Sequence, residues 1–538
     1  MSNFILNLSG PQWRRNEGQS VTNYKGQAFL ENDPVTPSQL AEHISQATSN
    51  SSVQLLLQRL NGFYAWVSQD ETSLRACVDH ARSWPLFYGQ KNGLFYLSDN
   101  AEWIRAQVGD KTMDPLAREE FLLAGFVTGR DTLYPNVKQI QAGEYLEAQA
   151  SNGQIQLKTS RYYRFWHTEP GVCDKTELLE QLQDATISAM RRLIQKAAGR
   201  RIVIPLSGGY DSRLVATMLK KLGYDNVLCF TYGVSGNKEA EYSRKIAKAL
   251  GFDWAFVEYS TDLWREAWRT LEAEIYRENA ANHTSLPHVQ DWLAVKTLVE
   301  RKKITSDDLI VPGHTGDFVA GGHIPRFVFA RELHTEEQLL RALVKDHLSN
   351  IPKQEIYFLG EDRLYKRLKC RIASKFDNTA AGVANLYEMW DWQERQAKYI
   401  INSVRVYDQF ELDWWLPLWD LEFVKFWEAV PLSFRDQRWL CKQWITEQYT
   451  AQVGEHDETS RLKNASDHSF LLGLMKIIAK KMPQVIFEKI KIARDQRKTR
   501  GHFLAVKGLV PEKDLDGFMS KQYNIIGIYS ELYLTGKW

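Results

Sequence analysis

Pro205-Leu-Ser-Gly-Gly-Tyr-Asp-Ser-Arg213 is the stretch that decides the fold, and it stands between an apolar run and a helical pattern over Ser212–Leu222. The two glycines let the backbone approach a ligand closely. The start of the helix directs free N–H groups and a positive dipole end at the same point. Ser207 and Ser212 add hydroxyl groups, and Asp211 adds a carboxylate suited to Mg²⁺. The stretch predicts a site for a polyphosphate and its metal ion.

Two other interpretations of this loop are available. A Walker loop is excluded, because the G-x-x-x-x-G-K spacing and its lysine are missing. An ordinary strand-to-helix turn could also use a glycine pair. The Asp and Ser at fixed offsets, with a strand before and a helix after, favour the ligand site.

The segments around this loop alternate between strand and helix patterns. A long helix is expected over residues 175–198, and mostly helical chain from about residue 335. Between them we expect strands at 201–206, 227–232, 254–259 and 309–311, and helices at 212–222 and 240–250. This order predicts βαβ units with a parallel sheet.

Residues 1–165 have a different pattern, with short aromatic and apolar runs separated by Asn, Asp and Gly turns. Strands are expected at 63–67, 74–78, 85–88 and 94–97, a hairpin turn at Asn152-Gly153, and a helix over Ala117–Leu123. We therefore predict an α/β protein of two domains, residues 1–170 and 171–538.

The composition excludes several classes of protein. The 538 residues are 44% hydrophobic and 25% charged, which excludes a disordered, collagen-like or coiled-coil chain. Lys and Arg (68) nearly balance Asp and Glu (66), so nucleic acid is not an expected partner. The N-terminus does not resemble a signal peptide, and no long apolar stretch predicts a membrane span. The five cysteines form no CxxC pair, which predicts a reducing, cytoplasmic location without disulfides or a zinc site. They are Cys77, Cys173, Cys229, Cys370 and Cys441.

Ser207-Gly-Gly-Tyr-Asp-Ser212 resembles the SGGxDS signature of the ATP pyrophosphatases, and within that group the chain is similar to the asparagine synthetase family. Further segments resemble family motifs in the family's order: Phe230–Gly233, Glu239–Gly251, Gly313–Gly322 (SGEGxDExFGGY), Leu416–Asp420 (VPFLD), and in front Leu60–Ala65 (LNGxFA) and Ser83–Tyr88 (GxKPLYY). The resemblance implies an N-terminal Ntn-hydrolase-like αββα domain. It also implies a C-terminal parallel-sheet ATP-pyrophosphatase domain with helical additions.

The resemblance also implies a reaction. In this family a substrate carboxylate attacks the α-phosphorus of ATP, giving an acyl-adenylate and pyrophosphate, and an amine then displaces AMP. The implied ATP-binding residues are Leu206, Ser207, Gly208, Gly209, Asp211, Ser212, Tyr232 and Gly313. Asp211 and Asp317 would hold Mg²⁺. Lys463 best matches the family's charge-stabilising lysine, with Lys442 as the rival, expected in one helix with Trp439.

The second turn departs from the family pattern at two places. His314 occupies the place of the carboxylate that accepts the incoming amine's proton, and Phe318 replaces the acidic residue after Asp317. A histidine can act as a base near neutral pH, and a structural histidine is the alternative. We therefore expect a carboxylate substrate other than free aspartate, small or glycan-linked, and favour a sugar acid of surface-polysaccharide synthesis. An intramolecular peptide or β-lactam-type cyclase and a non-catalytic nucleotide-binding scaffold are the alternatives.

The front domain departs further. A working glutaminase needs a cysteine just after the initiator Met, whereas this chain begins Met1-Ser2-Asn3. We expect an inactive domain, with Ser2 as nucleophile the weaker alternative. The nitrogen would come from ammonia, from glutamine through another protein, or from an amine on the substrate. A homodimer is left open.

Three further features have an ordinary interpretation beside a functional one. Residues 471–502 combine apolar stripes with Lys and Arg, so we favour a docking helix pair over peripheral membrane contact. Glu394 and Arg395 could reach the acceptor, although an ion pair on a helix is favoured. The tryptophans at 414, 415, 419 and 427 are expected in the core, although a sugar ring could stack on them.

Overall fold

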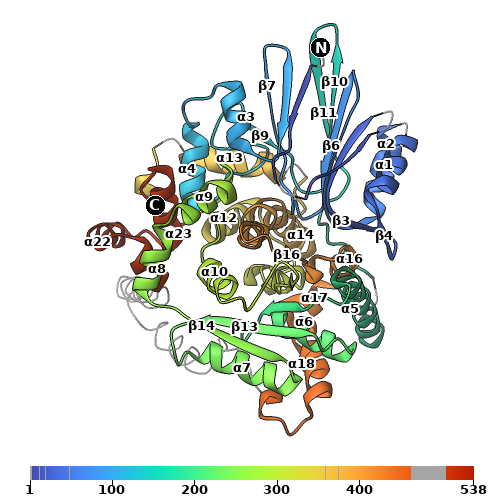
Figure 1. Ribbon diagram of the computed structural model, residues 1–538, viewed down its shortest axis with the longest axis vertical. Helices are drawn as coiled ribbons and strands as arrows, with labels where there is room; N and C mark the ends of the chain where they lie inside the picture. Colours follow the sequence, from blue (N-terminus) through green and yellow to red (C-terminus); the bar gives the residue numbers. More distant parts are fainter. Residues whose placement is uncertain are drawn as a thin grey trace.

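The computed structural model describes residues 3–10, 12–17, 20–47, 49–171, 173–357, 359–372, 375–461 and 504–538 (Figure 1). Lys463, Ser2 and the segment 471–502 lie outside the described residues. None of the described helices is both long enough and apolar enough to cross a membrane.

The front part of the chain contains two β-sheets. The four-stranded sheet has the order β1 (Phe4–Asn7), β8 (Leu94–Ser98), β7 (Phe87–Lys91), β9 (Lys138–Gln139). The seven-stranded sheet has the order β11 (Gln154–Arg161), β10 (Glu144–Ser151), β6 (Ser73–Val78), β5 (Leu60–Gln69), β3 (Val21–Leu30), β2 (Arg14–Glu17), with β4 (Asp33–Val35) on β3. The hairpin predicted at Asn152-Gly153 joins β10 to β11, and both residues have positive φ.

Strand β5 shows why this part forms layers. Its alternate side chains point to opposite faces, and both faces are buried. Tyr64 and Trp66 pack against α1 (Pro37–Gln46) and α2 (Asn50–Arg59), while Phe63 and Val67 belong to the core on the other face. Helix α3 (Ala101–Val108) covers the four-stranded sheet, and α4 (Pro115–Ala124) follows it. The predicted αββα arrangement is confirmed.

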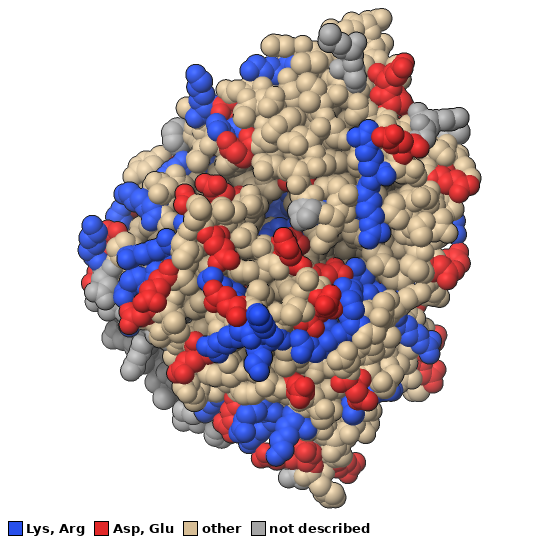
Figure 2. All heavy atoms as spheres, viewed as in Figure 1, with Lys and Arg blue, Asp and Glu red and all other residues tan. Residues whose placement is uncertain are grey.

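The back part is built around a five-stranded parallel sheet. Its order is β14 (Asp253–Glu258), β13 (Val227–Gly233), β12 (Ile202–Pro205), β15 (Leu309–Ile310), β16 (Asp413–Trp414). The expected helices are present as α5 (Lys175–Ala197), α6 (Tyr210–Lys221) and α7 (Lys238–Leu250). The predicted parallel α/β sheet is confirmed. On the face shown in Figure 2, basic and acidic side chains are mixed, in agreement with the small net charge of the chain.

Helices make up most of the remaining chain, as predicted. They are α8 (Thr261–Trp268), α9 (Leu271–Ala281), α10 (Trp292–Glu300), α11 (Gly316–Val319), α12 (Glu336–His347), α13 (Glu361–Ile372), α14 (Ala380–Trp390), a π-helix (Asp391–Ile400), α15 (Arg405–Gln409), α16 (Leu421–Glu428), α17 (Leu432–Arg435), α18 (Trp439–Val453), α21 (Leu504–Leu509), α22 (Glu512–Ser520) and α23 (Ile525–Leu534). Short 3₁₀ turns lie at Arg326–Ala330, Lys353–Glu355, Ile401–Val404, Pro417–Trp419, Asp436–Arg438 and Glu458–Arg461.

Candidate active site

The glycine-containing loop connects β12 directly to α6. Helix α6 begins at Tyr210 rather than at Ser212, so Asp211 and Ser212 lie in its first turn, and the predicted start was wrong by two residues. Ser207 Oγ lies 3.1 Å from Ser212 Oγ, which also accepts a hydrogen bond from Ser207 N–H. Gly209 N–H donates to Ser207 Oγ at 3.1 Å. No side chain caps the helix, so first-turn N–H groups are left for an anion.

A second turn reaches this loop from the neighbouring strand β15. A Cβ at Gly313 would lie 2.6 Å from Ser212 N, and one at Gly316 would lie 2.9 Å from Asp211 Cγ. Only glycine allows these two turns to come so close. Asp317 N–H donates to Asp211 Oδ2 at 3.0 Å. The structure therefore brings both predicted metal carboxylates, Asp211 and Asp317, together at the carboxyl end of the sheet.

Each of these carboxylates faces a cation. Burial raises the pKa of Asp211, an effect that the Arg438 guanidinium opposes by donating to Asp211 Oδ1. Burial also acts to raise the pKa of Asp317, but the hydrogen bond and charge of His323 hold it well below its usual range. His323 Nε2 lies 3.3 Å from Asp317 Oδ2, and its Nδ1 lies 2.5 Å from Asp391 Oδ2. Although burial opposes it, this pair of carboxylates raises the pKa of His323 to about 10.

His314 lies in the same turn, three residues before Asp317. Its Nε2 is 2.8 Å from Ser403 Oγ. Burial lowers the pKa of His314 to about 4, and the nearby charge of His288 acts in the same direction. The imidazole is therefore neutral at neutral pH, and its burial makes it a weaker base than an exposed histidine.

Tyr232 lies at the carboxyl end of β13, next to the loop. Its ring stacks on Tyr259, with ring centres 5.0 Å apart and planes 17° apart. Leu206 is buried, and its N–H donates to Phe230 O at 2.8 Å, which fixes the loop to β13. A flat aromatic surface thus stands beside the phosphate loop, and it includes the predicted ATP-binding residue Tyr232.

Two basic side chains reach the loop from the distant helix α18 and its preceding turn. Arg438, which the sequence reasoning missed, contacts Asp211 from 227 residues away. Lys442 shares α18 with Trp439, as predicted, and its Nζ lies 5.9 Å from the centre of the Tyr210 ring. His323 was also missed, although it directly follows the Gly313–Gly322 motif. No local pattern marks Arg438 as a partner of the loop.

The remaining predicted features are mostly structural. Phe318 is fully buried, with its ring centre 4.9 Å from that of Phe165, a place unsuited to a carboxylate. Glu394 does not reach this site; it is buried, pairs with Lys398 at 2.5 Å and accepts from Gly129 N–H at 2.8 Å. The predicted ion pair on the helix surface was wrong in its place and partner: Glu394 pairs with Lys398, both side chains are fully buried, and Arg395 Nη1 lies 4.0 Å from Asp391 Oδ1. The tryptophans at 414, 415, 419 and 427 are buried, as expected.

Family models match both parts of the chain. The model described as asparagine synthase matches residues 178–453, slightly more than half of the chain. The chain belongs to the asparagine synthase family. A second model, described as a glutamine amidotransferase domain, matches residues 41–163. These matches agree with the two-part resemblance in the sequence motifs.

Curated relatives of this asparagine synthase family member match over short segments. A probable asparagine synthetase (glutamine-hydrolyzing) of Acanthamoeba polyphaga mimivirus is 31% identical over 109 residues, 19% of this chain and 20% of the relative. The tRNA-specific 2-thiouridylase MnmA of Bordetella petrii is 27% identical over 176 residues, 31% of this chain and 42% of the relative. The chain thus spans less than half the length of either relative.

Solved structures give only weak likenesses. An NH3-dependent NAD synthetase from Campylobacter jejuni has 16% identity and a TM-score of 0.19, with 28% of this chain and 61% of that chain covered. A glutamine phosphoribosylpyrophosphate amidotransferase from B. subtilis has 13% identity and a TM-score of 0.20, with 56% and 64% covered. Scores this low carry no argument, and the fold rests on the topology described above.

Proposed function

We propose that the protein is an ATP-dependent ligase that forms an amide bond. It would activate a substrate carboxylate as an acyl-adenylate, release pyrophosphate, and transfer the acyl group to a nitrogen nucleophile with loss of AMP. The observation that carries this proposal is the convergence of the Ser207–Ser212 loop with the Gly313–Asp317 turn, through the Asp317 N–H to Asp211 Oδ2 bond. A site of this kind positions polyphosphate and reacting carboxylate together.

The two carboxylates fit Mg²⁺ held jointly with phosphate oxygens. Mg²⁺ in nucleotide sites uses one or two carboxylates plus substrate phosphates. Among the described residues no group of three or more His, Cys, Asp or Glu could hold a metal without such help. Asp211 and Asp317 would hold the ion, which would supply charge neutralisation on the pyrophosphate group when bound. Arg438 opposes the rise that burial causes in the pKa of Asp211, and His323 holds the pKa of Asp317 well below its usual range.

Basic residues of this chain would neutralise the remaining phosphate charge. Arg438 lies on Asp211, and Lys442 lies over Tyr210 in the first turn of α6. Lys463 keeps its proposed role from the sequence and lies outside the described residues. Leu206, Ser207, Gly208, Gly209, Ser212, Tyr232 and Gly313 would form the nucleotide cradle. Charge stabilisation of this type is a large part of phosphoryl-group catalysis.

We propose His314 as the base that takes the proton from the attacking nitrogen. Burial keeps its imidazole neutral over the physiological range. Its Nε2 is hydrogen-bonded to Ser403 Oγ at 2.8 Å. No hydrogen bond to Nδ1 is found within the described residues, so Nδ1 is the atom available to the nucleophile. The alternative is a structural histidine. In that case, replacing His314 would not slow amide formation selectively.

The front domain is proposed to be a structural support, with ammonia as the simplest nitrogen source. Asn61 of the Leu60–Ala65 motif and the nearby His80 contact the back domain. Asn61 Nδ2 donates to Asp420 Oδ1 at 3.0 Å, His80 Nε2 lies 2.7 Å from Trp419 O, and Trp392 Nε1 donates to His80 O at 2.8 Å. These bonds tie the front domain to the segment that follows β16 and to the π-helix Asp391–Ile400.

A sugar acid is the proposed acceptor, with a place in surface-polysaccharide synthesis and in the cytoplasm. The support is the change in the second turn, where His314 and the buried Phe318 replace two acidic residues of the family motif. An intramolecular cyclase shares the activation step and differs in taking its nitrogen from the substrate. A nucleotide-binding scaffold would need neither metal carboxylate.

The test is pyrophosphate release from ATP and Mg²⁺ with a panel of carboxylates, including aspartate and uronic acids, each with ammonium or glutamine. Release that depends on one carboxylate and is lost in Asp211→Ala supports the proposal. Ammonium acting where glutamine fails supports the structural front domain. Release equal in wild type and Asp211→Ala would contradict the assigned site.

A further inference from the structure

A second site lies at the edge of the parallel sheet opposite the phosphate loop. A cavity of about 260 Å³ is bordered by Lys196 before β12, Ser306 before β15 and Asp413 at the start of β16. In parallel strands these positions share one edge, whereas Ser207 and Gly313 follow the ends of β12 and β15 at the other edge. This cavity is therefore separate from the nucleotide site.

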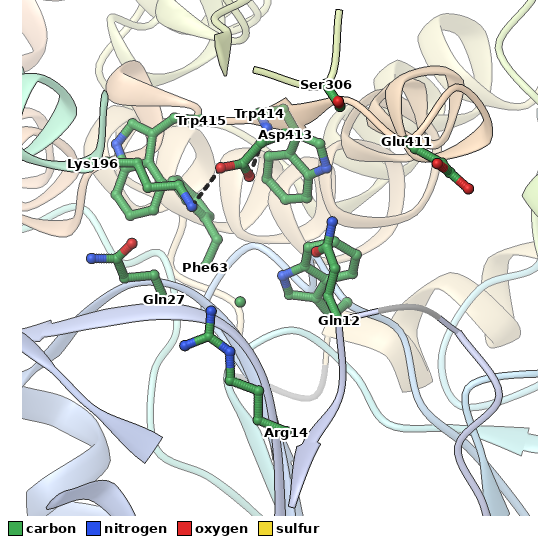
Figure 3. A pocket seen from close by; sticks show the side chains of 12 residues that line it. Gln12, Arg14, Gln27, Phe63, Lys196, Ser306, Glu411, Asp413, Trp414 and Trp415 are labelled. Carbon is green, nitrogen blue, oxygen red and sulfur yellow. Dashed lines mark hydrogen bonds and ion pairs between the residues drawn. The ribbon is translucent and has the colours of Figure 1, made fainter. Parts of the chain in front are cut away.

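Both domains contribute to the walls. The front domain supplies Gln12, Arg14, Gly26, Gln27, Phe63 and Trp84; the back domain supplies Lys196, Ser306, Glu411, Asp413, Trp414 and Trp415 (Figure 3). A volume near 260 Å³ lies just below the usual range for ligand pockets, about 300–1,000 Å³, so the cavity suits at most one small molecule.

The charge at the cavity favours an anion. In Figure 3 the Arg14 guanidinium and the Lys196 ammonium approach the cavity from opposite sides. Asp413 is shared between Lys196 at 2.8 Å and Arg200 at 2.9 Å, and Glu411 adds a second carboxylate to the lining. The cations Arg14, Lys196 and Arg200 therefore exceed the two carboxylates by one charge. Arg14 makes no ion pair or hydrogen bond within the described residues. A carboxylate between these cations would form charge-assisted hydrogen bonds.

Neutral polar groups and aromatic rings form the rest of the site. The side-chain amides of Gln12 and Gln27 have no hydrogen-bond partner in the described part of the chain. The indole N–H groups of Trp84 and Trp415 also lack one there, but these atoms are buried within the wall. Side-chain amides that can bond hydroxyl groups, with aromatic walls for C–H faces, are the chemistry of a sugar site.

The aromatic wall is rigid. The ring centres of Trp84 and Trp414 lie 5.0 Å apart, and those of Phe63 and Trp415 lie 4.7 Å apart. Behind Trp84, Lys25 Nζ lies 4.4 Å and the Arg405 guanidinium 4.9 Å from its ring centre. These cation–π contacts fix the rings before any ligand arrives, so little conformational entropy is lost on binding.

We propose that this interdomain cavity binds a hexuronic acid. Its carboxylate lies between Arg14 and Lys196, its hydroxyl groups meet Gln12 and Gln27, and its C–H faces meet the aromatic wall. The inference rests on the cavity alone and does not depend on the proposed ligase reaction.

Calorimetric titration of the full chain without nucleotide tests the site. The titrants are D-glucuronate, D-glucose as the neutral sugar, and L-glutamate as a carboxylate that is not a sugar. Arg14→Gln removes the guanidinium from an exposed strand position. Arg15→Gln is the matched control, because Arg15 points to the other face of β2 and pairs with Glu17.

Saturable binding of glucuronate is expected, weakened about tenfold or more in Arg14→Gln and unchanged in Arg15→Gln. Equal binding of glucose would overturn the carboxylate assignment, and tighter binding of glutamate would overturn the sugar assignment. Absence of saturable glucuronate binding, or equal binding by Arg14→Gln, would overturn the site. Each of these results leaves the pyrophosphate assay unaffected, so the two proposals fail separately.

Discussion

Replacing Gly313 by Ala tests whether the two turns must be in contact. The added Cβ would lie 2.6 Å from Ser212 N, 2.9 Å from Ser212 Cα and 3.0 Å from Asp211 C. All three are backbone atoms in the first turn of α6, so no rotamer change can relieve the overlap. Since ordinary contacts begin near 3.4 Å, the turns must separate by roughly 0.5–1 Å.

A displacement of this size has two calculable effects. Overpacking costs about 1–3 kcal/mol of unfolding free energy. Misplacing the metal carboxylates by about 1 Å lowers catalysis by about 100-fold. We expect Gly313→Ala to lose about that factor in kcat/KM for pyrophosphate release, with a lower Tm by differential scanning calorimetry. Gly360→Ala is the control, because no atom lies within 4 Å of its added Cβ. Gly313→Ala with wild-type kcat/KM would refute the reasoning.

Three other predictions concern the charged groups of the site. Arg438→Met leaves Asp211 buried without its cation, so the rate of pyrophosphate release should fall by about 100-fold. A smaller loss in Arg438→Lys would support the role of the positive charge at this position. His314→Gln should slow amide formation by about 100-fold while ATP–pyrophosphate exchange continues, and equal loss of both would contradict the base assignment. His323, whose pKa is raised to about 10, should stabilise the fold fully below pH 6.5 and lose this contribution as the pH rises through 10, a loss of roughly 5 kcal/mol. In His323→Gln the fall in Tm between pH 7 and 10 should be smaller; an unchanged fall would contradict the assignment.

Local patterns were enough to predict the loop. The apolar run before Pro205, the glycine pair and the helical spacing after it belong to one short segment, and β12 and α6 follow from it directly. The Gly313–Gly322 turn was likewise visible, because its glycines are required where the chain meets the first turn of α6.

Contacts between distant segments were not predictable. Arg438 meets Asp211 across 227 residues, and His323 meets Asp391 across 68 residues, so only the folded chain shows them. Strand β3 and helices α1 and α2 were missed for a different reason. Val21–Leu30 mixes polar and apolar residues without a regular alternation, and the capping box at Thr36 was a signal that went unused.

The transfer of oxygen from the carboxylate to AMP tests the central claim most directly. The activating substrate, once identified, would be labelled with ¹⁸O in its carboxylate and incubated with ATP, Mg²⁺ and ammonium. Attack on the α-phosphorus leaves one substrate oxygen on AMP when the amine displaces it. The account predicts ¹⁸O in AMP, with pyrophosphate unlabelled and the label lost in Asp211→Ala. Label in inorganic phosphate, with ADP as the nucleotide product, would contradict it.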